Sequence, residues 1–423
     1  MKIGQFAIQN ETSIDTIRHY ISLGLIIPEK HNTQFDFDDK CTIDFQEITA
    51  LKKIGFSLNE IQQLMLYRRI GKLTGYDRRI TYTSFFERKK TQIDNEIIKL
   101  DAMRQNLESA LNEMNREIEI DKSIDFETLG IPLQAFELLC CPHCHLPLNI
   151  LDGKVQNGQL IDAKLQCDHH HQIQIIDGIL FIENAKNIGE SDYKGTDLNL
   201  YSEAYIDEYI NTTDINYLKK LHEGLQWSSR HIAFEGLTDE IGLELGSGHG
   251  YFMRHMIECF PSTFTYIAID HDLTKLRWLK KIIERSHPKC TILFICADFL
   301  QIPLKPKTID VLFDISGSSN YAFDHTEFLL KKIDELVKDQ AHLHAFYILF
   351  KNYVTHSKVP QTFRDGFNIH SIQSNLKELN YHCTEDFETE SVEKGGPLEN
   401  YFVEGEHVST YFYSGIKVKK PLG

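Results

Sequence analysis

The chain has 423 residues, a length that suggests two to four domains rather than one core. Apolar residues make up 42% and charged residues 25% of the chain, which excludes wholesale disorder. The net charge of −16 is unevenly spread: residues 1–120 hold 17 Lys/Arg against 18 Asp/Glu, and residues 121–423 hold 28 against 43. Because phosphates repel an acidic surface, we expect only the N-terminal part to approach DNA.

Several features of the sequence bear on the compartment. No apolar run approaches the roughly 18 residues that span a bilayer. The opening segment MKIGQFAIQNE lacks the apolar stretch and small-residue cleavage site of a secretory leader. The nine cysteines are irregularly spaced, and four of them fall within residues 140–167. This spacing favours a local metal site in a reducing compartment over a disulfide framework. We expect a cytoplasmic protein that does not contact a membrane.

Residues 1–75 contain short amphipathic segments separated by turns. Residues 3–27 predict two short helices joined by a turn at Asn10–Thr12, and Ser13 can cap the second helix, Ile14–Leu23. The spacing places Ile17, Tyr20 and Ile21 toward a small core and leaves Arg18 and His19 outside. This is the pattern of a helix-turn-helix, whose second helix enters the major groove of DNA. Two amphipathic helices in sequence are also common without DNA binding.

Residues 76–120 predict a long helix with an apolar seam. From about residue 84 to 119 there is neither Gly nor Pro, and apolar residues recur at alternating steps of four and three. The seam consists of Ile93, Ile97, Leu100, Leu107, Leu111, Met114 and Ile118, with Arg104 at the one missing position. A single helix would leave this seam in water, so we expect it to pair with the same helix of a second subunit in a homodimer.

A family resemblance agrees with both segments. The run TSIDTIRHYISLGLIIPEK and the run LKKIGFSLNEIQQLM at Leu51–Met65, followed by the long helix, resemble the winged-helix DNA-binding domain of MerR-family regulators. The resemblance covers about residues 1–120 and implies a double-stranded DNA operator as partner. It implies that Arg18 and Tyr20 contact phosphates and that Ser13, Thr16 and His19 lie near base edges.

The wing of this domain departs from the family pattern. Phe35-Asp36-Phe37 stands where many MerR-family members carry a Tyr-Arg pair. The loss of an arginine removes one phosphate contact of the wing but leaves the fold intact. In the alternative interpretation, residues 1–120 form a module that no longer binds DNA and instead interacts with a protein.

Residues 121–184 are rich in cysteine and histidine. CCPHCHLPL places Cys141 and Cys144 with two residues between them, and CDHHHQIQIIDG supplies Cys167 and His171. Two such pairs, about twenty residues apart, form the N/S donor set that tetrahedral Zn²⁺ prefers, and four protein ligands make the site structural. Competing donors are Cys140, His143, His145, His169 and His170, and the alternative is a loop of free thiols.

A second resemblance chooses among these donors. The segment resembles the zinc ribbon that precedes the methyltransferase domain of ribosomal RNA guanine-N1 methyltransferases, where Cys-x2-Cys pairs with Cys-x3-His-Gln. His171-Gln172 fits that pattern, so the resemblance favours His171 as the fourth ligand.

Residues 185–423 alternate predicted strands with predicted helices. The expected strands are Ile241–Gly246, Thr265–Asp270, Thr291–Asp298, Ile309–Ser316 and His342–Phe350. The expected helices are Tyr251–Phe260, Asp272–Arg285 and His325–Val337. This alternation predicts a parallel sheet covered on both faces.

The run IGLELGSGHGYF carries a glycine-rich turn from a strand into a helix. Gly246, Ser247, Gly248 and Gly250 belong to this turn, where glycines let a ligand approach the backbone. The third glycine comes one residue too early for the dinucleotide fingerprint, and the Walker Lys-Ser/Thr ending is absent. Asp270 and Asp298 end the next two strands. A carboxylate at the first of these positions suits a pair of ribose hydroxyls, and one at the second suits an adenine amino group.

These features together resemble class I S-adenosylmethionine-dependent methyltransferases over roughly residues 185–375. The resemblance implies that the glycine loop holds the methionine part of the cofactor, with Glu244 lining the site of its amino group. It also implies that Asp270 holds the ribose and that Asp298 and Phe299 frame the adenine. The fourth strand delivers Asp314 to the same sheet edge.

No obligatory catalytic residue follows from the sequence, because an activated methyl group needs chiefly an aligned acceptor. His249, Asn320 and Tyr321 are candidates for the rim of the site. DISGSSNY stands where enzymes that methylate amino groups on bases carry Asn-Pro-Pro-Tyr or Asp-Pro-Pro-Tyr, which argues against DNA adenine methylation.

The sequence thus predicts a multidomain chain. Its parts are an all-α winged helix-turn-helix (1–75), a coiled-coil helix (76–120), a zinc ribbon (121–184) and an α/β Rossmann-like methyltransferase domain (185–423). We interpret the chain as a MerR-like regulator that methylates or senses a small molecule. The alternative is an enzyme acting on ribosomal RNA, another nucleic acid or a small molecule, with the helix-turn-helix as a docking module. A third interpretation is a sensor that binds S-adenosylmethionine without turnover.

Overall fold

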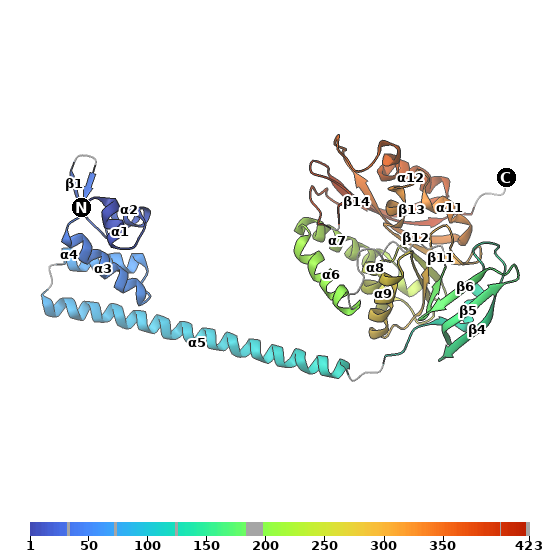
Figure 1. Cartoon of the computed structure of the whole chain (residues 1–423), viewed down its shortest axis with the longest axis horizontal. Coiled ribbons are helices and arrows are strands. Elements are labelled where there is room, and N and C mark those ends of the chain that lie inside the picture. Colours follow the sequence, from blue (N-terminus) through green and yellow to red (C-terminus); the bar gives the residue numbers. More distant parts are fainter. Residues whose placement is uncertain (32–33, 72–73, 123–125, 183–197, 398, 420–423) are drawn as a thin grey trace. The chain divides into compact units, whose positions relative to one another are not determined.

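A computed structural model of the chain describes residues 1–31, 34–71, 74–122, 126–182, 198–397 and 399–419. The chain separates into two compact units, Met1–Ile124 and Asp125–Gly423, each shown in Figure 1. This confirms a multidomain chain with a helical N-terminal region and an α/β C-terminal region. The finer division into four parts stays a prediction. Among the described helices, none is both long and apolar enough to cross a bilayer.

The first unit begins with a small helical head. Its elements are α1 (Ile3–Gln9), α2 (Ile14–Ser22), β1 (Glu29–His31), β2 (Gln34–Asp36), α3 (Asp39–Lys53) and α4 (Leu58–Ile70). Side-chain caps begin three of the helices: Ser13 for α2, Asp38 for α3 and Ser57 for α4. Phe6, Ile17, Phe37, Ile48 and Leu64 form a core in which each is at most 2% exposed. The predicted helix-turn-helix and its wing are therefore present as local structure.

The helix α5 (Gly75–Lys122) is 48 residues long, which corresponds to about 72 Å. Its first turns join the head: the Tyr82 hydroxyl donates to the Leu64 carbonyl at 3.0 Å, and Lys89 pairs with Glu60 at 2.8 Å. The seam predicted from the sequence is exposed along the helix. Its apolar members, from Ile93 to Ile118, are 42–63% exposed. This chain by itself therefore leaves the seam in water.

In the described part of the second unit, one sheet of 12 strands begins at the edge strand β13 with the order β13-β14-β12-β11-β8-β9-β10. These strands are β8 (Ile241–Leu245), β9 (Thr265–Asp270), β10 (Thr291–Cys296), β11 (Ile309–Ile315), β12 (Val337–Phe350), β13 (Tyr381–Glu388) and β14 (Val408–Lys417). β8 to β12 run parallel, whereas β14 is antiparallel to both of its neighbours. The strands predicted from β8 to β12 are confirmed.

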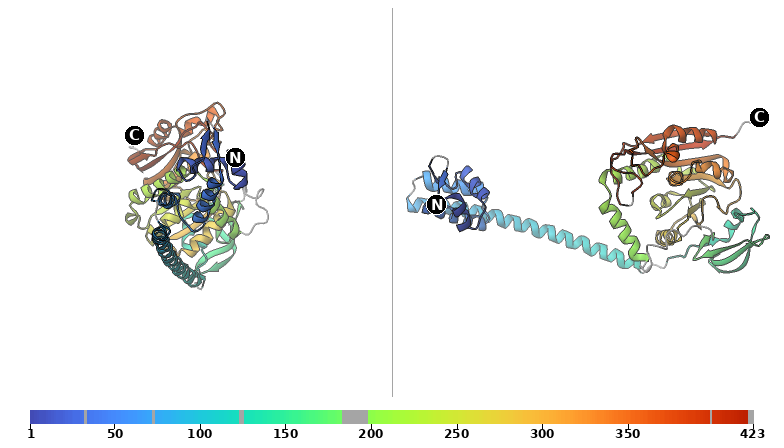
Figure 2. Two further views of the ribbon diagram at one scale, coloured as in Figure 1. Left: turned by 90° about the vertical axis from the view of Figure 1, so that its left-hand side faces the viewer. Right: turned by 45° about the horizontal axis from the view of Figure 1, so that its top comes forward.

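Helices cover both faces of this sheet, as Figure 2 shows in two further views. On one face, α7 (Ile215–His231), α8 (Tyr251–Met256) and α9 (Leu273–Arg285) pack on the alternate strand residues that include Tyr266 and Phe313. On the other face, α10 (Gly317–Ala322), α11 (Leu329–Lys332) and α12 (Ile369–Glu378) pack on the residues between them, such as Leu243 and Leu312. Two apolar layers thus enclose the parallel strands, and α6 (Leu198–Thr212) precedes α7.

Two expectations for this unit were wrong. Within the helix expected at His325–Val337, the structure has only the four residues of α11 and the short 3₁₀ turn Asp334–Leu336. The last expected residue, Val337, already belongs to β12. The sheet is mixed rather than parallel, because β14 pairs antiparallel with both β12 and β13. Neither β13 nor β14 was predicted from the sequence. Residues 408–417 contain small and polar residues among the aromatic ones, yet pairing on both sides buries nearly all of β14.

The cysteine-rich segment belongs to the same sheet. It contains β3 (Ile131–Pro132), the 3₁₀ turn η1 (Leu133–Leu138), β4 (Leu148–Gln156), β5 (Gln159–Cys167), β6 (Gln172–Ile176) and β7 (Ile179–Phe181). β7 pairs in parallel with β10, aligning Ile179 with Phe294 and Phe181 with Cys296. The segment therefore extends the central sheet past β10 instead of forming a detached ribbon.

This continuity predicts that a core change in β7 destabilises the sheet region that follows it in the chain. Leu180 is fully buried in the shared core, so Leu180→Ala is expected to cost about 2–5 kcal/mol of unfolding free energy. Trp227 and Trp278 are the chain's two tryptophans and both lie in the region after β7, so urea unfolding followed by their fluorescence reports on that region. Ile150→Ala on the exposed strand β4 is the control. An unchanged midpoint for Leu180→Ala would show that the two parts unfold separately.

Candidate functional site

The glycine-rich turn connects the end of β8 to the start of α8. Gly246, Gly248 and Gly250 have positive φ angles of 70°, 52° and 67°, a backbone conformation that side chains disfavour. A Cβ atom on Gly250 would lie 2.1 Å from Cδ1 of Leu279, so the third glycine is required for packing against α9. By contrast, Cβ atoms on Gly246 and Gly248 would meet nothing closer than 3.4 Å. A Cβ atom at either of the first two glycines would therefore meet its neighbours only at about van der Waals distance.

Hydrogen bonds attach this turn to the end of β9. The Ser247 amide donates to the Ile269 carbonyl at 2.8 Å, and the Gly248 amide donates to Oδ2 of Asp270 at 2.8 Å. Oδ1 of Asp270 accepts from the Asp272 amide at 2.8 Å. The structure thus brings Ser247, Gly248 and Asp270 together, as the sequence predicted. Each carboxylate oxygen of Asp270 retains acceptor capacity for a ligand hydroxyl.

Glu244 is enclosed beneath the turn. It is 2% exposed, and its Oε2 accepts a hydrogen bond from the Tyr266 hydroxyl at 2.9 Å. Burial raises the pKa of Glu244 to about 7, against the lowering effect of the Tyr266 hydrogen bond. Sequence analysis missed Tyr266. The only available signal was that a tyrosine in a buried strand needs a hydrogen-bond partner.

Asp298 and Phe299 follow β10 at the same edge of the sheet. Both are half-buried, and Cζ of Phe299 lies 3.4 Å from the position of a Cβ on Gly246. Oδ1 of Asp298 accepts from the Leu300 amide at 2.8 Å. The aromatic ring therefore lines the side of the glycine turn, where a planar group of a ligand can pack.

Asp314 lies at the end of β11 but is fully buried. Its Oδ1 accepts from the Ser318 amide at 2.8 Å, and burial raises its pKa to about 6. In the described structure it stabilises the turn into α10. Its role toward a cofactor stays a prediction.

Three aromatic rings pack together at the glycine turn: those of His249, Tyr205 and Trp278. The sequence analysis did not identify them as a group. The ring of His249 stacks on Tyr205 of α6 with centroids 4.0 Å apart and meets the edge of Trp278 at 5.4 Å. Burial lowers the pKa of His249 to about 4, so this imidazole is neutral at physiological pH. α6 is thereby connected to the glycine turn.

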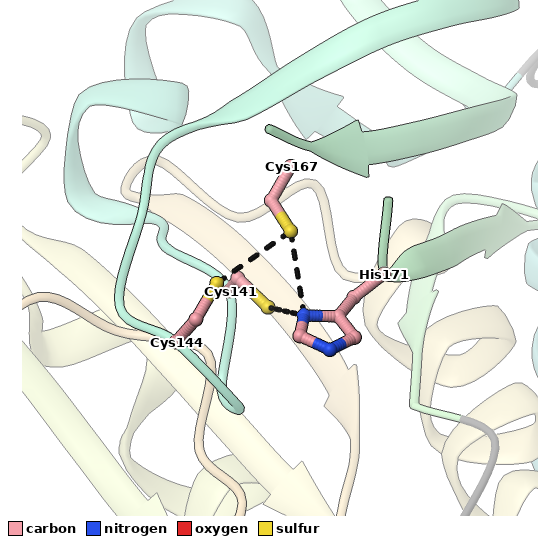
Figure 3. Close-up of side chains that lie close together, drawn as sticks. All are labelled: Cys141, Cys144, Cys167 and His171. Carbon is pink, nitrogen blue, oxygen red and sulfur yellow. Dashed lines mark hydrogen bonds between the residues drawn. The ribbon is translucent and has the colours of Figure 1, made fainter. Parts of the chain in front are cut away.

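The four predicted metal ligands lie together at the ends of β5 and β6, as Figure 3 shows. The ligand atoms of Cys141, Cys144, Cys167 and His171 are all within 4.8 Å of one another. Nδ1 of His171 is 3.5 Å from Sγ of both Cys141 and Cys167, and the Cys144 and Cys167 sulfurs are 3.6 Å apart. Tetrahedral bonds of about 2.3 Å to zinc place ligand atoms roughly 3.7 Å apart, so the donor set fits this ion.

The competing donors do not belong to this group. Cys140 is fully buried, and its amide donates to the Pro303 carbonyl at 3.0 Å. The rings of His143 and His169 lie 5.0 and 6.4 Å from that of His171. They surround the cluster without completing it.

The DNA-binding residues predicted on α2 divide by their burial. Ser13 caps the helix, accepting from the Thr16 amide at 3.0 Å, and the two hydroxyls are 2.8 Å apart. Arg18 and His19 are exposed, as expected for an outer face. Arg18 meets Asp15 at 3.3 Å, but both side chains are so exposed that this pair contributes little.

Tyr20 lies differently from the other predicted DNA-binding residues. It is 4% exposed, its ring packs against Phe45, and its hydroxyl accepts from Lys52 at 3.4 Å. Only its polar end is placed for a phosphate, and Lys52 adds a positive charge there that sequence analysis did not include. On the wing, Asp36 pairs with the N-terminal ammonium at 2.6 Å.

Comparisons with known families agree with the separation of the chain into two units, Met1–Ile124 and Asp125–Gly423. Residues 1–67 match the family described as MerR HTH family regulatory protein, and residues 45–110 match the family described as MerR, DNA binding. Residues 243–340 match the family described as methyltransferase domain. A search of curated proteins found no match. The chain therefore joins a region that matches MerR-type DNA-binding families to a region that matches a methyltransferase-domain family.

Solved structures similar to this chain include the MccD protein, with 9% identity, 46% of this chain and 96% of that chain covered, and a TM-score of 0.37. A methyltransferase from Methanosarcina mazei has 12% identity, coverages of 45% and 97%, and a TM-score of 0.35. One from Aquifex aeolicus has 14% identity, coverages of 52% and 98%, and a TM-score of 0.31. At these identities no activity is transferred from them.

The raised pKa of Glu244 predicts a pH-dependent stability difference. Its folded pKa of about 7 exceeds the ordinary value of 4.5, so the stability it contributes below pH 4.5 is lost as the pH rises through 7. Glu244→Gln carries no such charge. We expect the unfolding free energy of this variant, relative to wild type, to rise by about 1 kcal/mol between pH 6 and 8.5.

Urea unfolding of both proteins without ligand at the two pH values measures this difference. Glu258→Gln on the exposed end of the following turn is the control and is expected to follow wild type. Parallel pH profiles for wild type and Glu244→Gln would show that Glu244 ionises normally in the folded protein.

Proposed function

We propose that the chain is a cytoplasmic, dimeric, operator-binding regulator whose methyltransferase domain binds S-adenosylmethionine and methylates a small molecule. The observation that carries the proposal is the exposed apolar seam of α5 directly after the DNA-binding head. This seam requires a second copy of the chain, and a second copy supplies the second DNA-binding head. The irregular spacing of the nine cysteines, three of which belong to the Cys/His cluster, supports a reducing compartment.

The dimer follows from burial. Leu100, Leu107 and Met114 are 56–63% exposed on a helix of 48 residues. Apolar residues repeated at steps of three and four are buried when two such helices coil around each other. A two-fold dimer then places two α2 helices on two half-sites of a palindromic operator. Arg18 and His19 are exposed for this role, with Lys52 beside the Tyr20 hydroxyl.

The cofactor site is supported by the positive-φ backbone of Gly246 and Gly248, where a Cβ atom would meet no neighbour closer than 3.4 Å. The backbone of the turn can approach the methionine part there, and Phe299 borders the position for the adenine. Asp270 can accept from ribose hydroxyls, and Asp298 is placed at the adenine edge. The negative charge of ionised Glu244 would attract the positively charged amino group of the cofactor across the turn. The bound cofactor supplies an electrophilic methyl group, and the protein aligns the acceptor and excludes water.

The charge of the C-terminal region favours a small-molecule acceptor. Residues 121–423 carry 43 Asp/Glu against 28 Lys/Arg, so a large RNA would be repelled from most of this surface. This argues against the ribosomal RNA activity of the enzymes that have a similar zinc ribbon. A small molecule makes no such demand on the surface charge.

The cluster of Cys141, Cys144, Cys167 and His171 is proposed as a structural zinc site. Four protein ligands leave no position for a substrate, and the site lies where β5 and β6 continue the sheet. Zinc binding there stabilises the edge of the methyltransferase domain instead of taking part in its reaction.

We expect purified, reduced protein to contain about one zinc ion per chain. Cys167→Ser is expected to lose the metal and to lower the thermal unfolding temperature, since metal-binding energy contributes to folding. Cys259→Ser changes an exposed cysteine far from the cluster in sequence and serves as the control. Elemental analysis gives the stoichiometry, and wild-type protein without zinc would contradict the site.

A charge in the seam tests the proposed regulator. Leu107→Glu is expected to convert the dimer to a monomer in analytical ultracentrifugation and to abolish DNase protection of the DNA upstream of its own coding region. Ile98→Glu lies next to the seam, is 67% exposed and is expected to remain dimeric. Calorimetry with S-adenosylmethionine is expected to be the same for both variants, because the seam is far from the glycine turn in sequence. A monomeric wild type, or no protection at low salt, would overturn the proposal.

A further inference from the structure

The helix α6 lies at the glycine turn but buries little of its own surface. Its Tyr205 ring stacks on that of His249, with centroids 4.0 Å apart, and Ile206 packs against the apolar layer that includes Tyr266. Every residue from 205 to 212 is half-buried or exposed. Elements with few buried apolar contacts open at a low cost in free energy. Individual polar contacts therefore decide how firmly α6 stays on the turn.

The carboxylate of Glu399 joins α6 to α7. Its Oε1 accepts from the Tyr209 hydroxyl of α6 at 2.6 Å, and its Oε2 accepts from the Tyr217 hydroxyl of α7 at 3.0 Å. A hydrogen bond to a charged acceptor is roughly twice as strong as one between neutral groups. Tyr209 follows Tyr205 by one helical turn, and the two rings stack with centroids 6.0 Å apart. Glu399 is thus connected through two stacked rings to His249 of the glycine turn.

A buried cation lies beside this carboxylate. Lys220 is 3% exposed, and its ammonium lies 4.2 Å from the centre of the Tyr217 ring. Burial lowers the pKa of Lys220 to about 8, against the raising effect of the negative charge of Glu399. Lys220 therefore adds a favourable charge interaction to the two hydrogen bonds that Glu399 accepts.

The segment that carries Glu399 is itself attached to the sheet. The hydroxyl of Tyr401 lies 2.8 Å from that of Tyr217, and its ring lies 6.3 Å from that of Phe350 at the end of β12. Phe402 is 8% exposed and belongs to the same apolar cluster as Phe350. Because its neighbours are packed in this way, Glu399 presents its carboxylate to α6 from a fixed position.

We propose that Glu399 is a positioning residue for the cofactor: by holding Tyr209, it keeps Tyr205 of α6 stacked on the glycine turn. The inference rests on the proposed binding of S-adenosylmethionine at that turn. The hydrogen bonds of Glu399 reach α6 and α7, so its effect on the turn passes through α6. Without the bond to Tyr209, α6 leaves the turn more often, and the apparent affinity falls with the fraction of molecules that are ready to bind.

Calorimetry of the full-length chain with S-adenosylmethionine tests this role. Tyr209→Phe removes one hydroxyl and keeps the ring, whereas Glu399→Ala removes the acceptor. Each is expected to weaken cofactor binding at least about threefold. The double variant is expected to bind like Glu399→Ala alone, because both changes break the same bond. Glu404→Ala removes an exposed carboxylate of the same segment and is expected to bind like wild type.

Tyr217→Phe separates positioning from general stability. It breaks the other hydrogen bond of the same carboxylate but leaves the one to α6. It is expected to lower the thermal unfolding temperature, because it leaves Oε2 of Glu399 without that donor. Its cofactor affinity is expected to stay within about twofold of wild type. An equal loss of affinity in Tyr217→Phe and Tyr209→Phe would show that Glu399 acts through the stability of the domain and would overturn the inference.

Amide hydrogen exchange without ligand gives a direct readout of α6. Residues 205–212 are expected to exchange faster in Tyr209→Phe than in wild type, whereas the buried strands β8 and β9 are expected to exchange equally in both. S-adenosylmethionine is expected to slow the exchange of residues 205–212 in wild type. Unchanged exchange of these residues in Tyr209→Phe would overturn the inference.

The calorimetry also distinguishes this inference from the proposed function. Cofactor binding by wild type with the same affinity in Tyr209→Phe and Glu399→Ala would overturn the role of Glu399 and leave the proposed function in place. Absence of cofactor binding by wild type would contradict the proposed function, and the inference with it.

Discussion

The hydrogen bond from the Gly248 amide to Asp270 holds the glycine turn on the end of β9. With the Ser247 amide bound to the Ile269 carbonyl, it determines where the open side of the turn faces. Gly250 allows α8 to begin at once, because any side chain there would collide with Leu279. Because these bonds fix the turn, Phe299 lies at a defined position beside Gly246 and Glu244 at a defined position beneath it.

The continuous sheet gives the cysteine cluster a structural meaning. β7 pairs with β10, and β10 pairs with β9, so the Cys/His cluster and the glycine turn belong to one hydrogen-bonded framework. Cys167 ends β5 and His171 precedes β6, so the cluster lies at the turn of the β5–β6 hairpin, which extends the sheet. Loss of a metal there would act on the methyltransferase domain through the order of its sheet.

Buried charges mark the places where this chain gives up stability. Glu244, Asp314 and Lys220 are each at most 3% exposed, and burial shifts the pKa of each toward its neutral form. Asp314 is compensated by the turn into α10, and Glu244 in part by Tyr266. Lys220 has no comparable hydrogen bond. Groups of this kind cluster at functional sites, where a ligand supplies the missing interaction.

Much of the molecule followed from local patterns. The cap at Ser13, the seam of α5, the glycine turn and the Cys/His pairs each depend on residues within a few positions of one another. Local spacing determines such features because helix periodicity, capping and turn geometry operate over one or two turns of chain. The strands β8 to β11 followed in the same way from their apolar composition.

Only the tertiary structure decided which distant segments meet. The pairing of β7 with β10 joins residues more than 100 positions apart, and β14 lies between β12 and β13 despite a composition rich in polar residues. The contact between Tyr266 and Glu244 spans 22 positions, and one cavity wall combines the start of α7 with the end of β13. Apolar periodicity shows that a strand has a buried face, but it carries no information about which edge the strand pairs with. For that reason the motifs could be found in the sequence, whereas their polar partners could not.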